Sequence, residues 1–158
     1  MSEKRQFCTF ELDGRLCGIE VVEIQEVIRW HAMTRVPLAP SMVRGLINLR
    51  GQIVTAIDLR NRLGLPPLPP GTLPTNIVVR TPTGPISLLV DEIGDVVEVS
   101  DEIAEPPPGH LTGFHRAVTR GVYKLDGRLM LSLDTQRLLQ ITDAQDSNPA
   151  PGETARAA

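Results

Sequence analysis

The stretch that decides the fold is residues 45–58, which begin Gly-Leu-Ile-Asn-Leu-Arg-Gly-Gln-Ile and close on Ile-Asp. Residues 121–134 repeat it in register, beginning Gly-Val-Tyr-Lys-Leu-Asp-Gly-Arg-Leu and closing on Leu-Asp. A second echo lies upstream of each copy, because residues 22–28 match residues 91–97 by residue class. Order, approximate spacing and residue types all agree, so we interpret the chain as a duplication of two related β modules.

Short segments rich in Val, Ile and Leu alternate with glycine-containing turns, which predicts a mainly β protein. Asp13-Gly14 is typical of a two-residue hairpin turn, whose central positions need a positive φ. The same reasoning predicts four hairpins, with strands at 6–12 and 15–19, 46–49 and 52–58, 76–81 and 86–90, and 118–125 and 128–133. The pattern predicts a buried set made of Phe10, Leu12, Ile19, Ile47, Leu49, Ile53, Ile57, Leu89, Val97, Leu129 and Leu133.

Helix is expected only in short pieces. Residues 40–44 begin with proline and are followed by glycine, a pattern that favours one helical turn. Asp134 can cap a helix over 135–141, where Leu138 and its apolar neighbours share one face. Residues 142–158 are small, polar or Pro/Gly, and we predict a disordered tail there.

The proline-rich segment 64–75 cannot be a central strand, because proline lacks a backbone donor. It lies at the boundary that the repeat predicts, so we interpret it as a linker. The chain then divides into a first subdomain at about 6–63 and a second at about 76–134. The PxxP spacing in this segment leaves open a ligand for an aromatic-lined groove.

Composition argues against several function classes. The chain has 158 residues with 16 Lys+Arg against 19 Asp+Glu, and its aromatic content is 3%. Scattered basic residues and few aromatics argue against nucleic-acid binding, and no apolar run reaches membrane-spanning length. Cys8 and Cys17 are expected to be reduced, buried strand residues.

Signatures of catalysis or metal binding are missing from the sequence. No phosphate-binding glycine loop and no G-x-S-x-G elbow are present. His110 and His115 lack a third ligand in a recognisable spacing. The acidic residues from Asp91 to Glu105 alternate with valine and isoleucine, which indicates one solvated strand face. We therefore expect no catalytic residues, no cofactor and no metal.

One difference between the two copies points to function. Arg50 lies at the tip of the first turn, whereas Asp126 takes that position in the second copy. A residue that only maintains the fold should not reverse its charge so easily. The planar guanidinium of Arg50 can reach carboxylates of a partner, or it can pair inside the protein with Glu26.

The ordered set of motifs resembles the CheW family of bacterial chemotaxis coupling proteins. The set comprises Gly18-Ile19, Ile24-Gln25-Glu26-Val27-Ile28, Thr34-Arg35-Val36-Pro37 with Pro40, residues 45–51 and 57–60, Leu89 to Ile93, and Leu133-Asp134. The resemblance covers about residues 6–141. It implies two SH3-like five-stranded β-barrel subdomains that share a hydrophobic interface.

The resemblance also implies a function. Such a protein is a cytoplasmic, non-enzymatic adaptor that couples the tips of methyl-accepting chemoreceptors to the regulatory domain of a CheA-type histidine kinase in membrane-associated arrays. Family receptor-contact positions fall on Ile24, Glu26, Gly45, Asn48 and Arg50. The hairpin turn Asp13-Gly14 is our hypothesis for the kinase contact. The chain is expected to be a monomer on its own.

Two alternatives remain. A CheW-like paralogue could serve a non-chemotactic chemosensory pathway, such as surface motility or biofilm formation, through the same adaptor mechanism. A small β-barrel ligand-binding domain or enzyme is an alternative of another class, and a deep pocket with convergent ionisable groups would favour it.

Overall fold

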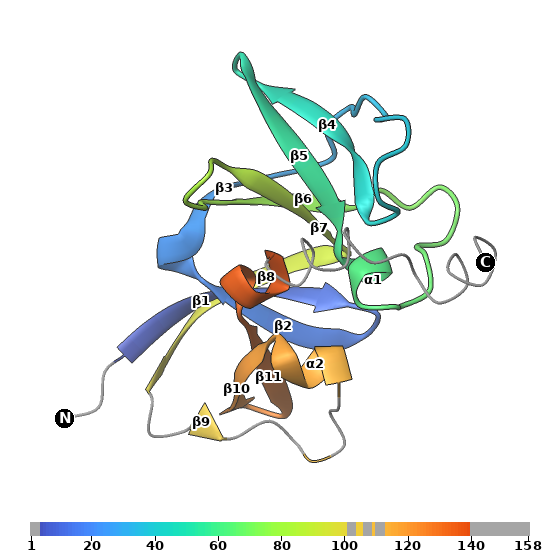
Figure 1. Cartoon of the computed structure of the whole chain (residues 1–158). Coiled ribbons are helices and arrows are strands. Elements are labelled where there is room, and N and C mark those ends of the chain that lie inside the picture. The colour runs from blue at the N-terminus through green and yellow to red at the C-terminus, as the bar shows by residue number, and fades with distance from the viewer. Residues whose placement is uncertain (1–3, 101–103, 106–108, 110–112, 140–158) are drawn as a thin grey trace.

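The computed structural model describes residues 4–100, 104–105, 109 and 113–139, and it places their strands in two sheets (Figure 1). Sheet A contains, in spatial order, β8 (Glu92–Ser100), β1 (Lys4–Leu12), β2 (Arg15–Glu20), β11 (Arg128–Leu133), β10 (Thr119–Leu125) and β9 (Ala104–Glu105). Sheet B contains β3 (Ile24–Ile28), β6 (Thr75–Val79), β7 (Ile86–Val90), β5 (Gln52–Asp58) and β4 (Val43–Leu49). The prediction of a mainly β protein is confirmed.

The helical elements are short: η1 (Val21–Glu23), α1 (Leu59–Arg62), α2 (Gly113–Ala117) and residues 135–139. The predicted helix at 135–141 is confirmed over 135–139, and Asp134 caps it by accepting a hydrogen bond from the Arg137 N–H at 3.0 Å. The predicted helix at 40–44 is wrong. Only a turn forms there before β4 begins, since the Val43 N–H bonds to the Pro40 carbonyl at 2.9 Å.

The duplication is visible in the strand register. In sheet B, Gly45 pairs with Ala56 and Asn48 with Ile53; in sheet A, the residues 76 positions later pair in the same way, as Gly121 with Ser132 and Lys124 with Leu129. A register irregularity stands at the same place in both pairs, before each glycine. The upstream repeat, residues 22–28 and 91–97, agrees as well. Its two copies contribute β3 and β8, which pair antiparallel with β6 and β1, and each pair has one register irregularity.

The two sheets do not coincide with consecutive subdomains at 6–63 and 76–134. The hairpin β1–β2 comes from the first half of the chain but lies in sheet A with β8, β10 and β11. The hairpin β6–β7 comes from the second half but lies in sheet B with β3, β4 and β5. The cause is that β2 pairs in parallel with β11, and β7 with β5, so each hairpin joins the sheet of the other half.

A shared hydrophobic core joins the sheets, as the resemblance implied. Phe10, Leu12 and Ile19 of sheet A pack in one buried cluster with residues such as Ile57 and Leu88 of sheet B. Each sheet also has an inner cluster of its own. The cluster inside sheet A contains Phe7, Val99, Tyr123 and Met130, and the one inside sheet B contains Ile47, Leu49, Val54 and Val78.

Eight of the eleven residues predicted to be buried are buried. The predictions for Ile53 and Leu129 are wrong, because their side chains are 60% and 46% exposed, and Val97 is only half-buried. Ile53 and Leu129 occupy equivalent positions just after a hairpin turn. At that end of β5 only the inner face of sheet B is covered, and the β4–β5 hairpin projects away from the rest of the molecule (Figure 1).

Residues 142–158, the predicted tail, lie outside the described residues, as does His110. Cys8 and Cys17 are free and buried in neighbouring strands, as expected. No helix in the described part of the chain is long and apolar enough to cross a membrane.

Candidate protein-binding site

The β4–β5 turn holds Arg50 in an unusual backbone conformation. Arg50 has a φ of 51° and Gly51 a φ of 86°, the two positive values that a tight hairpin of this twist requires. Asn48 stabilises the turn, because its Oδ1 accepts a hydrogen bond from the Gly51 N–H at 2.9 Å. In the equivalent turn Gly127 has a positive φ but Asp126 does not, so the two turns differ in backbone conformation.

Arg50 forms a two-pronged ion pair with Glu26 on β3. Its Nη1 donates to Oε2 and its Nη2 donates to Oε1, both at 2.7 Å. The hydrogen bond from Arg50 lowers the pKa of Glu26, and the same bond raises the pKa of Arg50. The Glu26 side chain is 18% exposed and that of Arg50 is 75% exposed, so most of the Arg50 side chain stays accessible to a partner.

The ion pair also shows that sheet B is strongly curled. Glu26 lies on β3 and Arg50 at the end of β4, and these strands stand at opposite ends of the strand order. The sheet therefore curls until its two ends approach one another. Thr34, which follows β3, adds to this contact by exchanging backbone hydrogen bonds of 2.8 Å with Leu46 of β4.

The other predicted receptor-contact residues, Gly45 and Ile24, are less exposed than Asn48 and Arg50. Gly45 is buried where Thr34 crosses β4, and a Cβ there would lie 2.7 Å from the Thr34 carbonyl oxygen. Ile24 is half-buried and packs against the shared core. The structure thus brings three polar side chains together near the surface and places Gly45 and Ile24 beneath or beside them.

An exposed apolar side chain accompanies this polar group, because Ile53 faces Asn48 across the β4–β5 pair and is 60% exposed. Val27 is 41% exposed, but it follows Glu26 on β3 and therefore points to the opposite face of that strand. An apolar side chain that a partner can cover, next to an arginine held in place, is typical of the centre of a protein–protein interface. Sequence reasoning missed Ile53 as a surface residue, because it assigned this side chain to the core.

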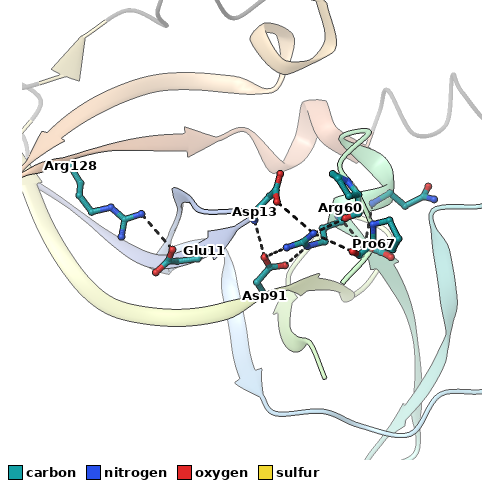
Figure 2. Close-up of polar contacts among 9 residues, drawn as sticks. Glu11, Asp13, Arg60, Pro67, Asp91 and Arg128 are labelled. Carbon is teal, nitrogen blue, oxygen red and sulfur yellow. Dashed lines mark hydrogen bonds and ion pairs between the residues drawn. The ribbon is translucent and has the colours of Figure 1, made fainter. Parts of the chain in front are cut away.

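A second constellation surrounds the Asp13-Gly14 turn, and Arg60 of α1 is at its centre (Figure 2). Arg60 donates to Asp91 twice, from Nε at 2.8 Å and from Nη2 at 2.6 Å, and its Nη1 donates to the Pro66 carbonyl at 2.6 Å. Asp13 lies 3.8 Å from the same Nη1, and its backbone N–H donates to Asp91 at 2.8 Å. One guanidinium therefore holds the linker, the β1–β2 turn and the start of β8 together.

Asp91 is the anionic partner in this constellation, which corrects the expectation that the acidic run is wholly solvated. Burial alone would raise the pKa of Asp91, but the hydrogen bonds from Arg60 and from the Asp13 N–H outweigh burial and lower it. Sequence reasoning missed Arg60 and Asp91 as a pair. The available signal was an arginine two residues after a helix-capping aspartate, Asp58, whose Oδ1 accepts from the Arg60 N–H at 3.0 Å.

A groove of about 680 Å³ lies between sheet B, η1 and the helix at 135–139. Val22, Thr55 and residues of the helix at 135–139 line it, and its ionisable lining residues are Glu23 and Arg80. Arg80 donates to the Val22 carbonyl at 3.0 Å and Glu23 accepts from Thr135. The two ionisable residues of the groove are thus engaged in hydrogen bonds within the protein. Among the described residues, no group of three or more His, Cys, Asp or Glu could hold a metal ion.

Comparisons with known proteins agree with this picture. The family model described as a CheW-like domain matches residues 6–143. The chain is 31% identical over 126 residues to the chemotaxis protein CheW of Rhizobium meliloti, covering 80% of this chain and 81% of that protein. It is 29% identical over 141 residues to a probable chemotaxis protein CheW of Rhizobium etli, covering 89% and 91%.

A solved structure is similar in three dimensions. The crystal structure of the scaffolding protein TtCheW from Thermoanaerobacter tengcongensis superposes with a TM-score of 0.75 at 27% identity, covering 83% of this chain and 89% of that one.

Proposed function

This chain belongs to the CheW-like domain family, and from that membership we propose that it is a non-enzymatic adaptor that couples methyl-accepting chemoreceptors to a CheA-type histidine kinase. The family-model match over residues 6–143 carries this proposal, because it spans both sheets and all the candidate site residues. The adaptor works in the cytoplasm and is recruited to membrane-associated receptor arrays through its partners.

The receptor contact in this proposal is the group formed by Glu26, Asn48 and Arg50, with Ile24 and Gly45 shaping the strands beneath it. The ion pair to Glu26 fixes the guanidinium of Arg50, so little side-chain freedom is lost when a receptor binds. The kinase contact is the Asp13-Gly14 turn, which Asp91 and Arg60 hold in place.

The experiment that tests the receptor site is binding of purified variants to a receptor cytoplasmic fragment, at matched salt, and separately to the kinase regulatory domain. Arg50→Ala should weaken receptor binding at least about tenfold, with the fold and kinase binding unchanged. Arg50→Asp should be worse, because it also repels receptor carboxylates. Because Arg50 and Glu26 are bonded to each other, the double alanine variant should lose less than the sum of the single losses.

Asp126→Ala is the matched control, because Asp126 is exposed at the equivalent turn of the other sheet. This substitution should leave receptor binding and kinase binding unchanged. If Arg50→Ala weakened binding to the receptor fragment and to the kinase domain equally, Arg50 would be a structural residue rather than a receptor contact. Unchanged receptor binding would remove the proposed site.

The same fold and site are compatible with an adaptor in a non-chemotactic chemosensory pathway. Co-purification with receptor fragments and a CheA-type kinase favours an adaptor over a ligand-binding domain or enzyme, and the genes that neighbour this one indicate which pathway the adaptor serves.

A further inference from the structure

The proline-rich segment between α1 and β6 has a restricted backbone. Residues 65–70 read Leu-Pro-Pro-Leu-Pro-Pro, so every residue in this stretch is a proline or directly precedes one. A proline ring fixes φ at about −65°, and a residue before proline is confined to extended backbone. Together these restrictions favour a polyproline II helix, which has about three residues per turn.

The burial of the side chains follows a period of three. Leu65 and Leu68 are half-buried, whereas the proline pairs at 66–67 and 69–70 are exposed. Leu65 packs against the core that the two sheets share, and Leu68 lines a small recess together with Leu89. The two leucines therefore face the protein, and the two proline pairs face solvent one helical turn apart.

Hydrogen bonds hold both ends of this segment. The Leu65 N–H donates to the Arg60 carbonyl at 2.7 Å, and Arg60 Nη1 donates to the carbonyls of residues 66 and 67 at 2.6 Å and 3.5 Å (Figure 2). At the other end, the Thr72 N–H donates to the Pro69 carbonyl at 3.1 Å. The exposed prolines are thus fixed before any partner arrives, and binding orders little new chain.

The chemistry of this surface indicates the kind of partner. Extended proline segments bind to grooves lined by aromatic side chains, as in SH3 and WW domains. A second copy of this chain does not fit that description, because Trp30 is the one exposed aromatic side chain among the described residues. Arg44 lines the same recess as Leu68, and its side chain is 53% exposed beside Asp58. A carboxylate at the rim of the partner's groove complements this arginine.

We propose that residues 65–70 are a docking surface for a protein with an aromatic-lined groove that has acidic residues at its rim. The proline pairs at 66–67 and 69–70 enter the groove, and Arg44 pairs with the acidic rim. Arg44 and Arg50 lie at opposite ends of β4, so this surface is distinct from the proposed receptor contact. The proposal goes beyond the adaptor function and does not depend on it.

The test is biolayer interferometry of the purified full chain against two probes, an SH3 domain with an acidic rim and a WW domain. We expect saturable binding to at least one probe, and the double variant Pro66→Ala with Pro69→Ala should weaken it at least about fivefold. Arg44→Gln should slow association with the SH3 domain and reduce its salt dependence. Pro82→Ala is the control, because Pro82 is an exposed proline in the turn between β6 and β7, and it should leave binding unchanged.

The free peptide of residues 63–72 is a second ligand in the same assay, and each probe is checked with a proline-rich peptide of its own. If both probes bind their own peptides but not the full chain, the proposal is wrong. Binding of the free peptide alone would then mean that the folded protein hides the prolines. Binding that the double variant retains in full would place the contact elsewhere. If that variant does not fold, the same two substitutions in the free peptide decide whether the prolines are read.

Discussion

Gly45 and Gly121 occupy equivalent positions at the start of the β4–β5 and β10–β11 pairs, but the space above them differs. A Cβ on Gly45 would lie 2.7 Å from the Thr34 carbonyl oxygen and 3.1 Å from the Met33 Cβ. A Cβ on Gly121 would lie 3.6 Å from the Glu105 carbonyl oxygen, an ordinary contact distance. The segment that crosses each strand is therefore much closer in sheet B than in sheet A.

This difference predicts unequal effects of one substitution. Gly45→Ala should lower the free energy of unfolding by about 1–3 kcal/mol, because backbone atoms of Thr34 must move. Gly121→Ala should be close to neutral. Urea unfolding of both variants measures this, and equal losses would contradict it. A Gly45 variant that binds receptor poorly would then act through the shape of β4 rather than through a lost contact.

At the residue scale, the charge reversal between two copies of one turn singled out Arg50, and the pairing with Glu26 that the structure shows was one of two alternatives left open by the sequence. The sequence did not predict the pairing of Arg60 with Asp91. These residues are 31 positions apart, and their meeting depends on how the linker returns to the sheet. Short-range patterns do not carry that information.

At the scale of elements, Arg60 connects α1, the linker, the β1–β2 turn and β8. Its side chain is 11% exposed and that of Asp91 is 16% exposed, so the pair is largely shielded from water. Removing one partner leaves the other charge buried and uncompensated, which costs more than the pair itself contributes.

Asp91→Asn should therefore lower the free energy of unfolding by about 2 kcal/mol at pH 7. The pKa of Asp91 is lowered in the folded protein, so its contribution is present above the unfolded pKa of about 4 and is lost as pH falls through the lower folded value. The difference in free energy of unfolding between wild type and Asp91→Asn should therefore become smaller below about pH 4. Urea unfolding at several pH values tests this, with the exposed neighbour Glu92→Gln as control. A gap of constant size would mean that side-chain shape, not charge, matters.

The elements themselves were partly predictable. Hairpins with Asp-Gly or Arg-Gly turns were located from the sequence because the turn chemistry is local. Helix α1 was missed although Asp58 caps it as Asp134 caps the helix at 135–139, because four residues give too little periodicity. Ile53 and Leu129 were misassigned because strand alternation indicates two faces but not how far along each face the neighbouring sheet extends.

At the scale of the whole molecule, the exchange of hairpins between the halves is the dominant feature. The sequence revealed two related halves that meet at residues 64–75, and the register confirms the repeat. It did not reveal that β1–β2 completes sheet A and β6–β7 completes sheet B. Both hairpins form by local pairing, whereas the parallel contacts that assign them to a sheet are long-range.

Fragments cut in the linker test this arrangement. Residues 1–70 and 71–158 should each fail to fold alone, because each contributes only part of both sheets and of the shared core. Mixed together, they should form a folded complex. Circular dichroism and amide NMR spectra of the separate and mixed fragments measure this. A cooperative thermal transition in either fragment alone would contradict it.

The exchange also constrains how the protein emerges from the ribosome. Strands β1 and β2 are synthesised first, yet their partner β11 ends at Leu133. Sheet A therefore cannot close until most of the chain has been translated, and Phe7, which packs inside sheet A against Tyr123 and Met130, stays uncovered until then. Sheet B, which spans residues 24–90, can be assembled earlier. Biogenesis should thus proceed with a nascent intermediate in which sheet B is ordered while the first hairpin is still a substrate for chaperones.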